Sequence, residues 1–394
     1  MQALHLTAYT TISALGLGNA AAAAALRDMR GGLSRCDFED VDLDTWIGRV
    51  DGVENAVIAG SLGAYDCRNN RLAAMALDTD GFADAVARAR HRHGAARIGV
   101  FLGTSTSGIL ETEHAYRQLN ADGSLPAGYR FRESHEIFSL TDFVRRRLEL
   151  QGPALTVSTA CSSSAKVFAT AARHIQAGWC DAAVVGGADS LCQMTLYGFH
   201  SLQLVSTLPC RPLDAGRDGI SIGEAAAFAL LERPADTDAG VALLGYGESA
   251  DGYHLSSPHP EGRGALEAMH AALDRAGLDA AALDYVNLHG TGTPANDSAE
   301  TRAVDALAGS SVPAGSTKGW TGHTLGAAGA TEAVFSALAI EGGFLPGTLN
   351  LDTPDPALAP LDLVRNSRAG AVRRVLSNSL GFGGSNCSLL LGAT

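Results

Sequence analysis

Paired cysteines, long apolar runs and a basic leader are all missing from this sequence. Its seven cysteines are an odd number and none falls in a CxxC pair, which argues against a zinc site or a disulfide framework. No stretch approaches the roughly 18 apolar residues that a membrane span needs, and the amino terminus lacks a basic segment followed by an apolar run. We therefore expect a cytoplasmic protein with reduced thiols and no membrane span.

Positive charge is also scarce. The chain carries 29 Lys and Arg against 42 Asp and Glu, a formal net charge of −13. Nucleic-acid binding relies on basic surfaces that displace counterions from phosphates, so we expect no nucleic-acid partner. An acidic protein partner would need a local basic patch. The candidate clusters are Arg68 with Arg71, Arg130 with Arg132, and the run Arg145 to Arg147.

Glycine and apolar residues, in contrast, are abundant. The 46 glycines, 46% hydrophobic residues and 18% charged residues are typical of a compact enzyme with many tight turns. A length of 394 residues exceeds the usual single-domain range and predicts two domains or one duplicated unit. The polar stretch from Glu232 to Gly240 is the predicted boundary, which divides the chain into residues 1–240 and 241–394.

Strand-like and helix-like patterns alternate along the chain and predict a mixed α/β fold. Buried strands are predicted at residues 97–102, 155–158, 182–185, 225–231, 241–246, 285–288, 372–377 and 387–391. Helices are predicted at residues 82–92, 163–176, 265–276, 299–307 and 327–341.

A glycine pair near the amino terminus matches a dinucleotide-binding pattern in part. Gly16, Gly18 and Ala21 fit the form GxGxxA, but the acidic residues about 20 positions on lie in a polar loop and not at the end of a strand. A tight strand-to-helix turn is the better interpretation, with Asn19 as the predicted N-cap of a helix over residues 20–29.

Cys161 is the candidate nucleophile. It lies in the segment STACSSS, where a strand ending at Val157 turns into a helix that begins with hydroxyl residues. The unpaired amides and positive dipole end of a helix favour thiolate over thiol. A lone cysteine among alanines is also a common small core residue, so the segment alone leaves both interpretations open.

Two histidine loops lie downstream. His289 opens the segment HGTGTP directly after a buried strand, a place from which a ring can enter a cleft. His323 lies in KGWTGHTLGAAG, which also holds Lys318, with Glu332 on the following helix as its predicted carboxylate partner. Each histidine has a structural alternative, and the Lys318–Glu332 pair has the alternative of only orienting its loop.

A third glycine-rich loop, GFGGSN, surrounds Phe382 and leads into the last strand. Such a loop can let the ring move and point its amides at a ligand. A glycine-rich turn with Phe382 as a core plug is the alternative.

These four segments, in this order and spacing, resemble the β-ketoacyl-acyl carrier protein synthases of the elongating type. Further matches are GGADS at 186–190, RPLD at 211–214, RDG at 217–219 and DGYH at 251–254. The resemblance covers nearly the whole chain. It implies a thiolase-like duplicated α-β-α-β-α layered fold with two mixed five-stranded sheets.

The resemblance also implies a reaction, a decarboxylative Claisen condensation. An acyl group passes from the phosphopantetheine of an acyl carrier protein to Cys161, and a malonyl unit on a second carrier protein loses CO₂ and attacks it. The amides of Cys161 and Phe382 would form the oxyanion hole, and Phe382 would act as a gate. His289 and His323 would both stabilise the enolate. No metal or redox cofactor is expected.

The resemblance assigns two further supporting roles. Lys318 with Glu332 matches a pair behind the second histidine, and Thr291 and Thr293 match positions that bind the pantetheine arm. Family members are dimers, so we expect a homodimer or a heterodimer with a related ketosynthase-like subunit.

The type of each catalytic residue also distinguishes this chain from related enzyme classes. Thiolases carry a second active-site cysteine, and initiating synthases use histidine and asparagine, whereas this chain offers two histidines. A catalytically silent chain-length-factor-like partner is the alternative, although such partners replace the cysteine. The opening LTAYTT at residues 6–11 and the run CSSS depart from primary fatty-acid enzymes and look closer to synthases of polyene-pigment or other specialised lipid pathways.

Overall fold

The computed structural model describes residues 1–234 and 240–394. The predicted boundary from Glu232 to Gly240 falls largely on residues 235–239, which lie outside the described residues. The division into residues 1–240 and 241–394 therefore stays a prediction.

The amino-terminal sheet holds the nucleophile's strand at its outer edge. Its strands β7 (Ala182–Asp189) and β9 (Ala225–Glu232) are buried at every residue, because helices cover both faces of the sheet and leave no polar side for alternation. β5 (Ile98–Gly103) pairs in parallel with β6 (Ala154–Val157) and β7, whereas β9 is antiparallel to β7 and β1 (Leu4–Ser13). In order across the sheet the strands are β1, β9, β7, β5 and β6.

The carboxy-terminal sheet repeats this plan. Its order is β10 (Val241–Ala250), β17 (Ser385–Ala393), β16 (Arg374–Gly381), β11 (Tyr285–Asn287), β12 (Pro313–Gly315) and the two-residue β14 (Asp362–Leu363). The two sheets meet where Leu4 and His5 of β1 pair with Leu243 and Ala242 of β10. The predicted pair of mixed five-stranded sheets is confirmed, with β14 as an extra strand.

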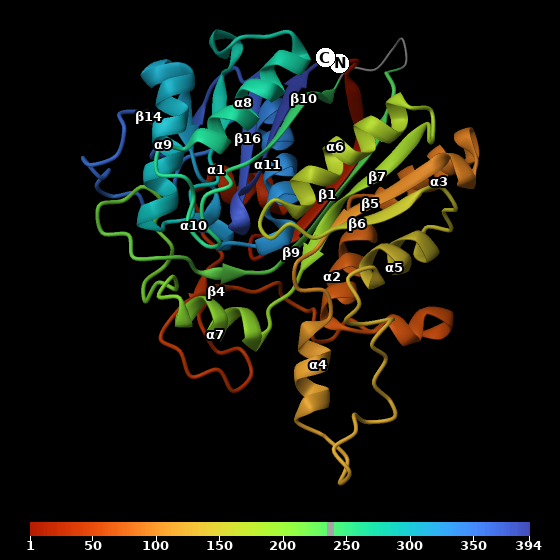
Figure 1. Cartoon of the computed structure of the whole chain (residues 1–394). Helices are drawn as coiled ribbons and strands as arrows, with labels where there is room; N and C mark the ends of the chain where they lie inside the picture. The colour runs from red at the N-terminus through yellow and green to blue at the C-terminus, as the bar shows by residue number, and fades with distance from the viewer. Residues whose placement is uncertain (235–239) are drawn as a thin grey trace.

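Helices form the other three layers (Figure 1). The central layer holds α6 (Ser163–Gln176) and α11 (Ala328–Gly342), which pack on each other and on both sheets. α11 is buried from Ala328 to Ile340, as expected for a helix that is apolar on every side. The outer helices are α2 (Arg68–Leu77), α3 (Phe82–His93) and α5 (Ser139–Arg147) on one sheet, and α8 (Arg263–Ala276) and α9 (Pro294–Ala308) on the other. The layered thiolase-like fold is thus confirmed.

Smaller elements complete the chain. The short strands are β2 (Gly16–Leu17), β3 (Ser34–Arg35), β4 (Trp46–Gly48), β8 (Ile222–Gly223), β13 (Phe344–Leu345) and β15 (Arg368–Ala369). The remaining helices are α1 (Gly18–Arg27), α4 (Ile109–Tyr116), α7 (Gln193–Ser201) and α10 (Lys318–Thr321). Among all helices of the described residues, none is long and apolar enough to cross a membrane.

The amino-terminal glycines form the expected turn, but the predicted N-cap is wrong. Helix α1 begins at Gly18 with Leu17 as its N-cap, so Asn19 lies inside the helix and its side chain donates to the Tyr9 carbonyl at 2.7 Å. The Asp80 carboxylate accepts a hydrogen bond from the Asn19 amide at 3.0 Å. This amide at the start of α1 is therefore already paired with a carboxylate of the protein itself.

Candidate active site

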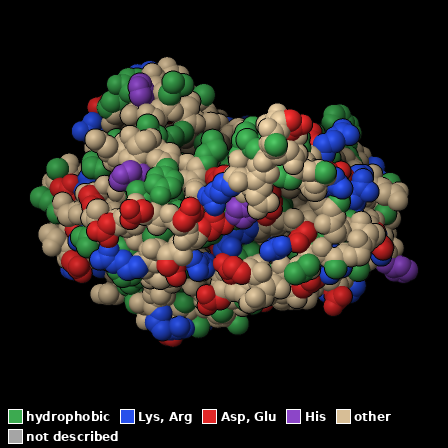
Figure 2. All heavy atoms as spheres, turned by 90° about the horizontal axis from the view of Figure 1, so that it is seen from below, with side chains coloured by type: hydrophobic (Ala, Val, Ile, Leu, Met, Phe, Trp, Pro, Cys, Tyr) green, Lys and Arg blue, Asp and Glu red, His purple; other side chains and the backbone are tan. Residues whose placement is uncertain are grey.

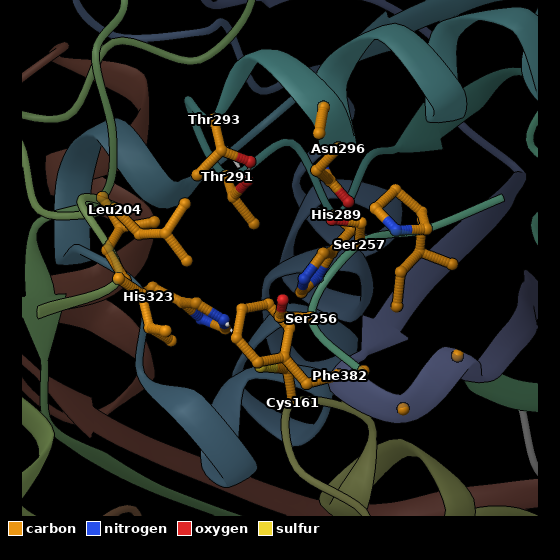
Figure 3. A pocket seen from close by; sticks show the side chains of 18 of the residues that line it. Cys161, Leu204, Ser256, Ser257, His289, Thr291, Thr293, Asn296, His323 and Phe382 are labelled. Atoms are coloured by element: carbon orange, nitrogen blue, oxygen red, sulfur yellow. Dashed lines mark hydrogen bonds between the residues drawn. The ribbon is translucent and has the colours of Figure 1, made fainter. Parts of the chain in front are cut away.

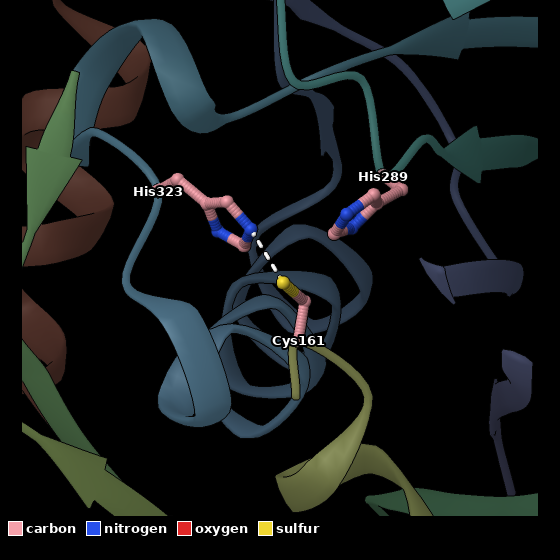
Figure 4. Close-up of side chains that lie close together, drawn as sticks. All are labelled: Cys161, His289 and His323. Atoms are coloured by element: carbon pink, nitrogen blue, oxygen red, sulfur yellow. Dashed lines mark hydrogen bonds between the residues drawn. The ribbon is translucent and has the colours of Figure 1, made fainter. Parts of the chain in front are cut away.

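Cys161 lies on a strained turn between β6 and α6. Ala160, directly before it, has φ +51°, a left-handed conformation that alanine rarely adopts. The Ser163 hydroxyl fastens the turn by donating to the Ala160 carbonyl at 2.6 Å and accepting from the Thr159 amide at 2.9 Å. The turn leaves Cys161 only 5% exposed, just before the helix, with its sulfur facing the two histidine loops (Figure 4).

His323 is the histidine in direct contact with the thiol. Its Nε2 lies 3.0 Å from the Cys161 sulfur. Strand β8 holds its backbone on both sides: the His323 amide donates to the Ser221 carbonyl at 2.7 Å, and the Gly223 amide donates to the His323 carbonyl at 3.0 Å. A fixed backbone and a buried side chain keep the ring at hydrogen-bond distance from the sulfur.

His289 enters the same site from the end of β11. Its ring is nearly perpendicular to that of His323, with centroids 5.2 Å apart. The Glu300 carboxylate on α9 accepts hydrogen bonds from the His289 amide at 2.7 Å and the Gly290 amide at 2.8 Å. The sulfur and one ring nitrogen of each histidine all lie within 4.8 Å of one another. The structure thus brings the three predicted catalytic residues together (Figure 4).

Lys318 and Glu332 form the predicted ion pair, but the pair lies beside His289 and not beside His323. The buried Lys318 ammonium contacts the Glu332 carboxylate directly and lies 3.2 Å from Nδ1 of His289. Strands β11 and β12 are parallel neighbours, so Lys318, which follows β12, lies beside the residue that follows β11. The expected placement behind His323 is therefore wrong. An ammonium donating to Nδ1 places the ring proton of His289 on Nε2, on the far side of the ring.

Burial dominates the electrostatics of the site. It raises the pKa of the Cys161 thiol to about 12, against the opposing effects of the Lys318 ammonium and the backbone N–H groups of Phe382 and Cys161. The sequence predicts a stabilised thiolate, and here desolvation outweighs the helix terminus. Burial, with the nearby Lys318 charge, also holds the pKa of His289 and of His323 well below the usual histidine value, so both rings are neutral.

Two backbone amides point at the sulfur, those of Cys161 and Phe382. Donors in this arrangement can bind the oxygen of a carbonyl attached to that sulfur. Phe382 lies in a single turn, Phe382–Gly384, where Gly383 has φ +80° and donates to the Leu255 carbonyl at 2.8 Å. The Phe382 ring is half-buried and faces the Phe199 ring at 5.6 Å, above the sulfur (Figure 3).

A cavity of about 200 Å³ opens above the three catalytic side chains (Figure 3). Thr291 and Thr293 line it, with their hydroxyls 2.8 Å apart. Sequence reasoning missed several lining residues, among them Phe199, Leu202, Leu204, Ser256, Ser257 and Asn296. They come from loops and helix ends whose composition carries no chemical signal.

Glu300 and Asp189 are two buried positioning residues that sequence reasoning also missed. Asp189 accepts hydrogen bonds from the Thr104 hydroxyl at 2.6 Å and from the Gly326 amide at 2.6 Å, and so ties the loop after His323 to the end of β5. The sequence offered one signal for each residue. Glu300 lies in the helix directly after HGTGTP, and Asp189 ends the strand that carries GGAD.

The structure corrects one of the basic clusters. Arg68 is buried and makes a two-fold hydrogen bond to Glu224, and Arg71 pairs with Asp66. The Arg68 guanidinium is therefore unavailable for a protein partner, and that of Arg71 is engaged with a carboxylate. Figure 2 shows the same mixing of signs on the lower face, where basic and acidic side chains are interspersed.

The other two clusters differ in exposure. Arg145 and Arg146 pair with Asp142, and Arg147 pairs with Asp78. Arg130 and Arg132 remain exposed, and the long contact of Arg132 with Glu136, at 3.9 Å, leaves its side chain 84% exposed.

Comparison with known proteins matches both halves of the chain to one family. Residues 69–237 match the model of the β-ketoacyl synthase N-terminal domain, and residues 241–352 match that of the C-terminal domain. A 3-oxoacyl-[acyl-carrier-protein] synthase 2 of Rhizobium meliloti is 39% identical over 322 residues, which cover 74% of this chain and 73% of the relative. The Staphylococcus aureus enzyme of the same name is 36% identical, covering 75% and 76%.

Solved structures give the same result. A ketosynthase in complex with its chain length factor, from Xenorhabdus doucetiae, is 38% identical with a TM-score of 0.91, covering all of this chain and 98% of its own. The ishigamide ketosynthase/chain length factor is 29% identical with a TM-score of 0.90, covering 100% and 99%. This chain belongs to the β-ketoacyl synthase family of condensing acyltransferases.

Proposed function

We propose that Cys161, His289 and His323 carry out a decarboxylative Claisen condensation between an acyl group and malonyl-acyl carrier protein. The observation that carries the proposal is the convergence of one thiol and two neutral imidazoles within 4.8 Å, beneath a cavity and beside two free amides. The product is a β-ketoacyl thioester two carbons longer than the primer.

In the first half-reaction the sulfur attacks the acyl thioester that the carrier protein delivers. Because His323 Nε2 lies 3.0 Å from the sulfur, it accepts the thiol proton as the S–C bond forms. The amides of Cys161 and Phe382 bind the oxyanion, where one such donor typically contributes about 2.7–4 kcal/mol. The departing pantetheine thiolate takes that proton from His323 Nε2 as the tetrahedral intermediate collapses, so the ring becomes neutral again.

In the second half-reaction the malonyl thioester occupies the cavity above the acylated cysteine. The His289 ring donates a hydrogen bond to the thioester oxygen from Nε2, and the His323 ring does the same after its single proton has exchanged from Nδ1 to Nε2. The C–C bond to the carboxylate breaks, CO₂ leaves, and the electron pair forms the enolate. The enolate carbon then attacks the acyl carbonyl, and the bond to Cys161 breaks.

The supporting residues follow from their contacts. Lys318 donates to Nδ1 of His289 and so keeps its ring proton on Nε2, while Glu332 balances the buried ammonium charge. Thr291 and Thr293 bind the pantetheine arm, and Phe382 gates the acyl chain. We propose that no metal or redox cofactor takes part, since the donors for each step are present in the chain itself.

The partners proposed are acyl carrier protein and a second ketosynthase-like subunit. Strand β6 lies at the end of the sheet order with one edge unpaired among the described residues, and its Leu155 is 45% exposed. Two structural neighbours are ketosynthases with their chain length factors. A dimer across β6, either a homodimer or such a heterodimer, would cover this edge. These neighbours also support a specialised pathway, and the free state of all seven cysteines supports a cytoplasmic location.

Intact-protein mass spectrometry tests the proposal. Mixing the chain with acyl-acyl carrier protein should add one acyl group per chain, and Cys161→Ala should abolish the adduct. Adding malonyl-acyl carrier protein should then clear the adduct and release a β-ketoacyl product. A chain that forms no adduct with any primer of a broad series would instead be a silent partner subunit.

A further inference from the structure

The three catalytic side chains share a property that the condensation does not use. A thiol sulfur and two imidazole nitrogens within 4.8 Å of one another are a donor set for a borderline-soft divalent cation. A tetrahedral Zn²⁺ ion with bonds of about 2.0–2.3 Å separates its ligands by about 3.5 Å. The 3.0 Å between Cys161 Sγ and His323 Nε2 is shorter than that value, and the other donor pairs lie within 4.8 Å, so side-chain shifts would bring all three donors onto one ion.

We propose that Cys161, His289 and His323 form a reversible inhibitory Zn²⁺ site in the unacylated protein. The inference goes beyond the proposed condensation, because the ion competes with the acyl group for the same sulfur. Three protein ligands leave one tetrahedral position open, and the cavity above the site has room for a water molecule there.

The donors have the character that zinc requires. A cysteine sulfur and two imidazole nitrogens are a donor set found in catalytic zinc sites, and all three side chains are buried close together. Nδ1 of His289 faces Lys318, which leaves Nε2 as the coordinating atom of that ring. All three side chains are held from separate elements, namely the turn after β6, the end of β11 and the loop along β8.

Binding rearranges two protons. The Cys161 S–H bond breaks as the Zn–S bond forms, and that proton leaves to solvent. His289 gives up the proton on Nε2, and its Nδ1 becomes the protonated nitrogen. Nδ1–H and the Lys318 ammonium would then be two donors facing each other, so Lys318 opposes the metal through both its charge and its hydrogen bond.

This opposition gives the proposal its most discriminating test. Lys318→Met removes a buried positive charge beside the ligands and should tighten Zn²⁺ binding, while condensation becomes slower. Glu332→Gln removes the balancing negative charge and should weaken Zn²⁺ binding. Changes around a metal site typically alter affinity about 10–100-fold. A shift of both variants in the same direction would contradict the site.

The direct measurement is titration of the unacylated protein with Zn²⁺ alone, in competition with a fluorescent chelator. We expect one ion per chain. Cys161→Ser should lose at least about a hundredfold in affinity, because loss of a ligand exceeds loss of a supporting contact. Cys36→Ser, at a half-buried thiol outside the cavity, is the matched control and should bind normally.

Two further readouts keep the result independent of folding and of activity. Co²⁺ in place of Zn²⁺ should give a thiolate-to-metal charge-transfer band and intense visible bands of a four-coordinate ion. Protein already acylated on Cys161 should show neither. Zn²⁺ bound equally by Cys161→Ser or by the acylated protein would overturn the inference. Condensation measured with a chelator present tests the proposed function separately, so either can fail alone.

Discussion

At the scale of single residues, the two histidines differ more than their shared family role suggests. Only His323 contacts the sulfur, whereas His289 is held by Lys318 and Glu300. We expect His289→Ala to keep acyl transfer to Cys161 and to lose malonyl decarboxylation. His323→Ala should slow both steps, by about 10²–10⁴-fold for the loss of a general base.

Two assays separate these histidine variants. The time course of adduct formation by intact mass reports acyl transfer, and release of CO₂ from malonyl-acyl carrier protein reports decarboxylation. Equal acyl-transfer rates in both variants would show that His323 does not accept the thiol proton. Asn296→Ala, at a cavity residue that does not contact the sulfur, serves as the control for indirect damage.

The protonation state of Cys161 gives a second prediction at this scale. Burial raises the pKa of the thiol to about 12, so the thiolate fraction should increase about tenfold per pH unit between pH 7 and 10. Alkylation by iodoacetamide, followed by intact mass, should therefore accelerate through this whole range. A plateau at or below pH 8 would mean that the helix terminus, as the sequence suggests, wins over desolvation.

Much of the site was predictable at this scale because chemistry concentrates in rare residues. Cys161 follows β6 in one half of the chain, His289 follows β11 in the other, and His323 lies in a glycine-rich loop held against β8. The pairing of Lys318 with Glu332 was predictable from charge, but the histidine that Lys318 contacts was not. That contact depends on β11 and β12 being neighbours, a fact of sheet order that no local pattern encodes.

At the scale of elements, a strong hydrophobic periodicity predicted the boundaries of a helix well, and a weak periodicity did not. The predicted helix over residues 163–176 coincides with α6, since its apolar stripe and hydroxyl start are clear. Helices α2, α4, α5 and α7 were not predicted. In α2 the polar start RNNR, and in α5 the three arginines at its end, are typical of loops. Strand β6 was predicted as buried but lies at a sheet edge.

The turn that starts α1 gives a prediction about stability. Gly18 has φ +87°, and an added Cβ would lie 2.8 Å from Thr79 Cγ2 and 2.9 Å from an Asp80 oxygen. We expect Gly18→Ala to lower the free energy of unfolding by more than the roughly 1–2 kcal/mol that a left-handed alanine costs. Chemical denaturation measures it. Gly277→Ala, with φ +68° and open space around it, is the control for strain alone. Equal decreases in the free energy of unfolding of the two variants would show that the contacts with Thr79 and Asp80 add nothing to the backbone strain.

At the scale of the whole molecule, two features point to an incomplete assembly. The sheet ends in an exposed apolar strand, and the acidic chain keeps only one of its three predicted arginine clusters both exposed and loosely paired. Charge reversal at Arg130 and Arg132 should weaken binding of an acidic carrier protein, measured by titration calorimetry at low salt, where screening is least. The same reversal at the exposed Arg88 should have no effect if docking is local.

The edge strand carries the last prediction. An unpaired edge with an apolar side chain is a template for pairing with another chain, so Leu155→Glu should convert the dimer to a folded monomer. Mass photometry or light scattering measures the change, with circular dichroism as the check on folding. Val57→Glu places the same charge at a more exposed apolar residue, 69% exposed, in the loop after β4 and outside strand β6, and should leave the dimer intact. A dimer that survives Leu155→Glu would place the subunit contact on another surface. If the unsubstituted protein is itself a monomer, the β6 edge pairs with a different subunit. Leu155→Glu should then block binding of that subunit.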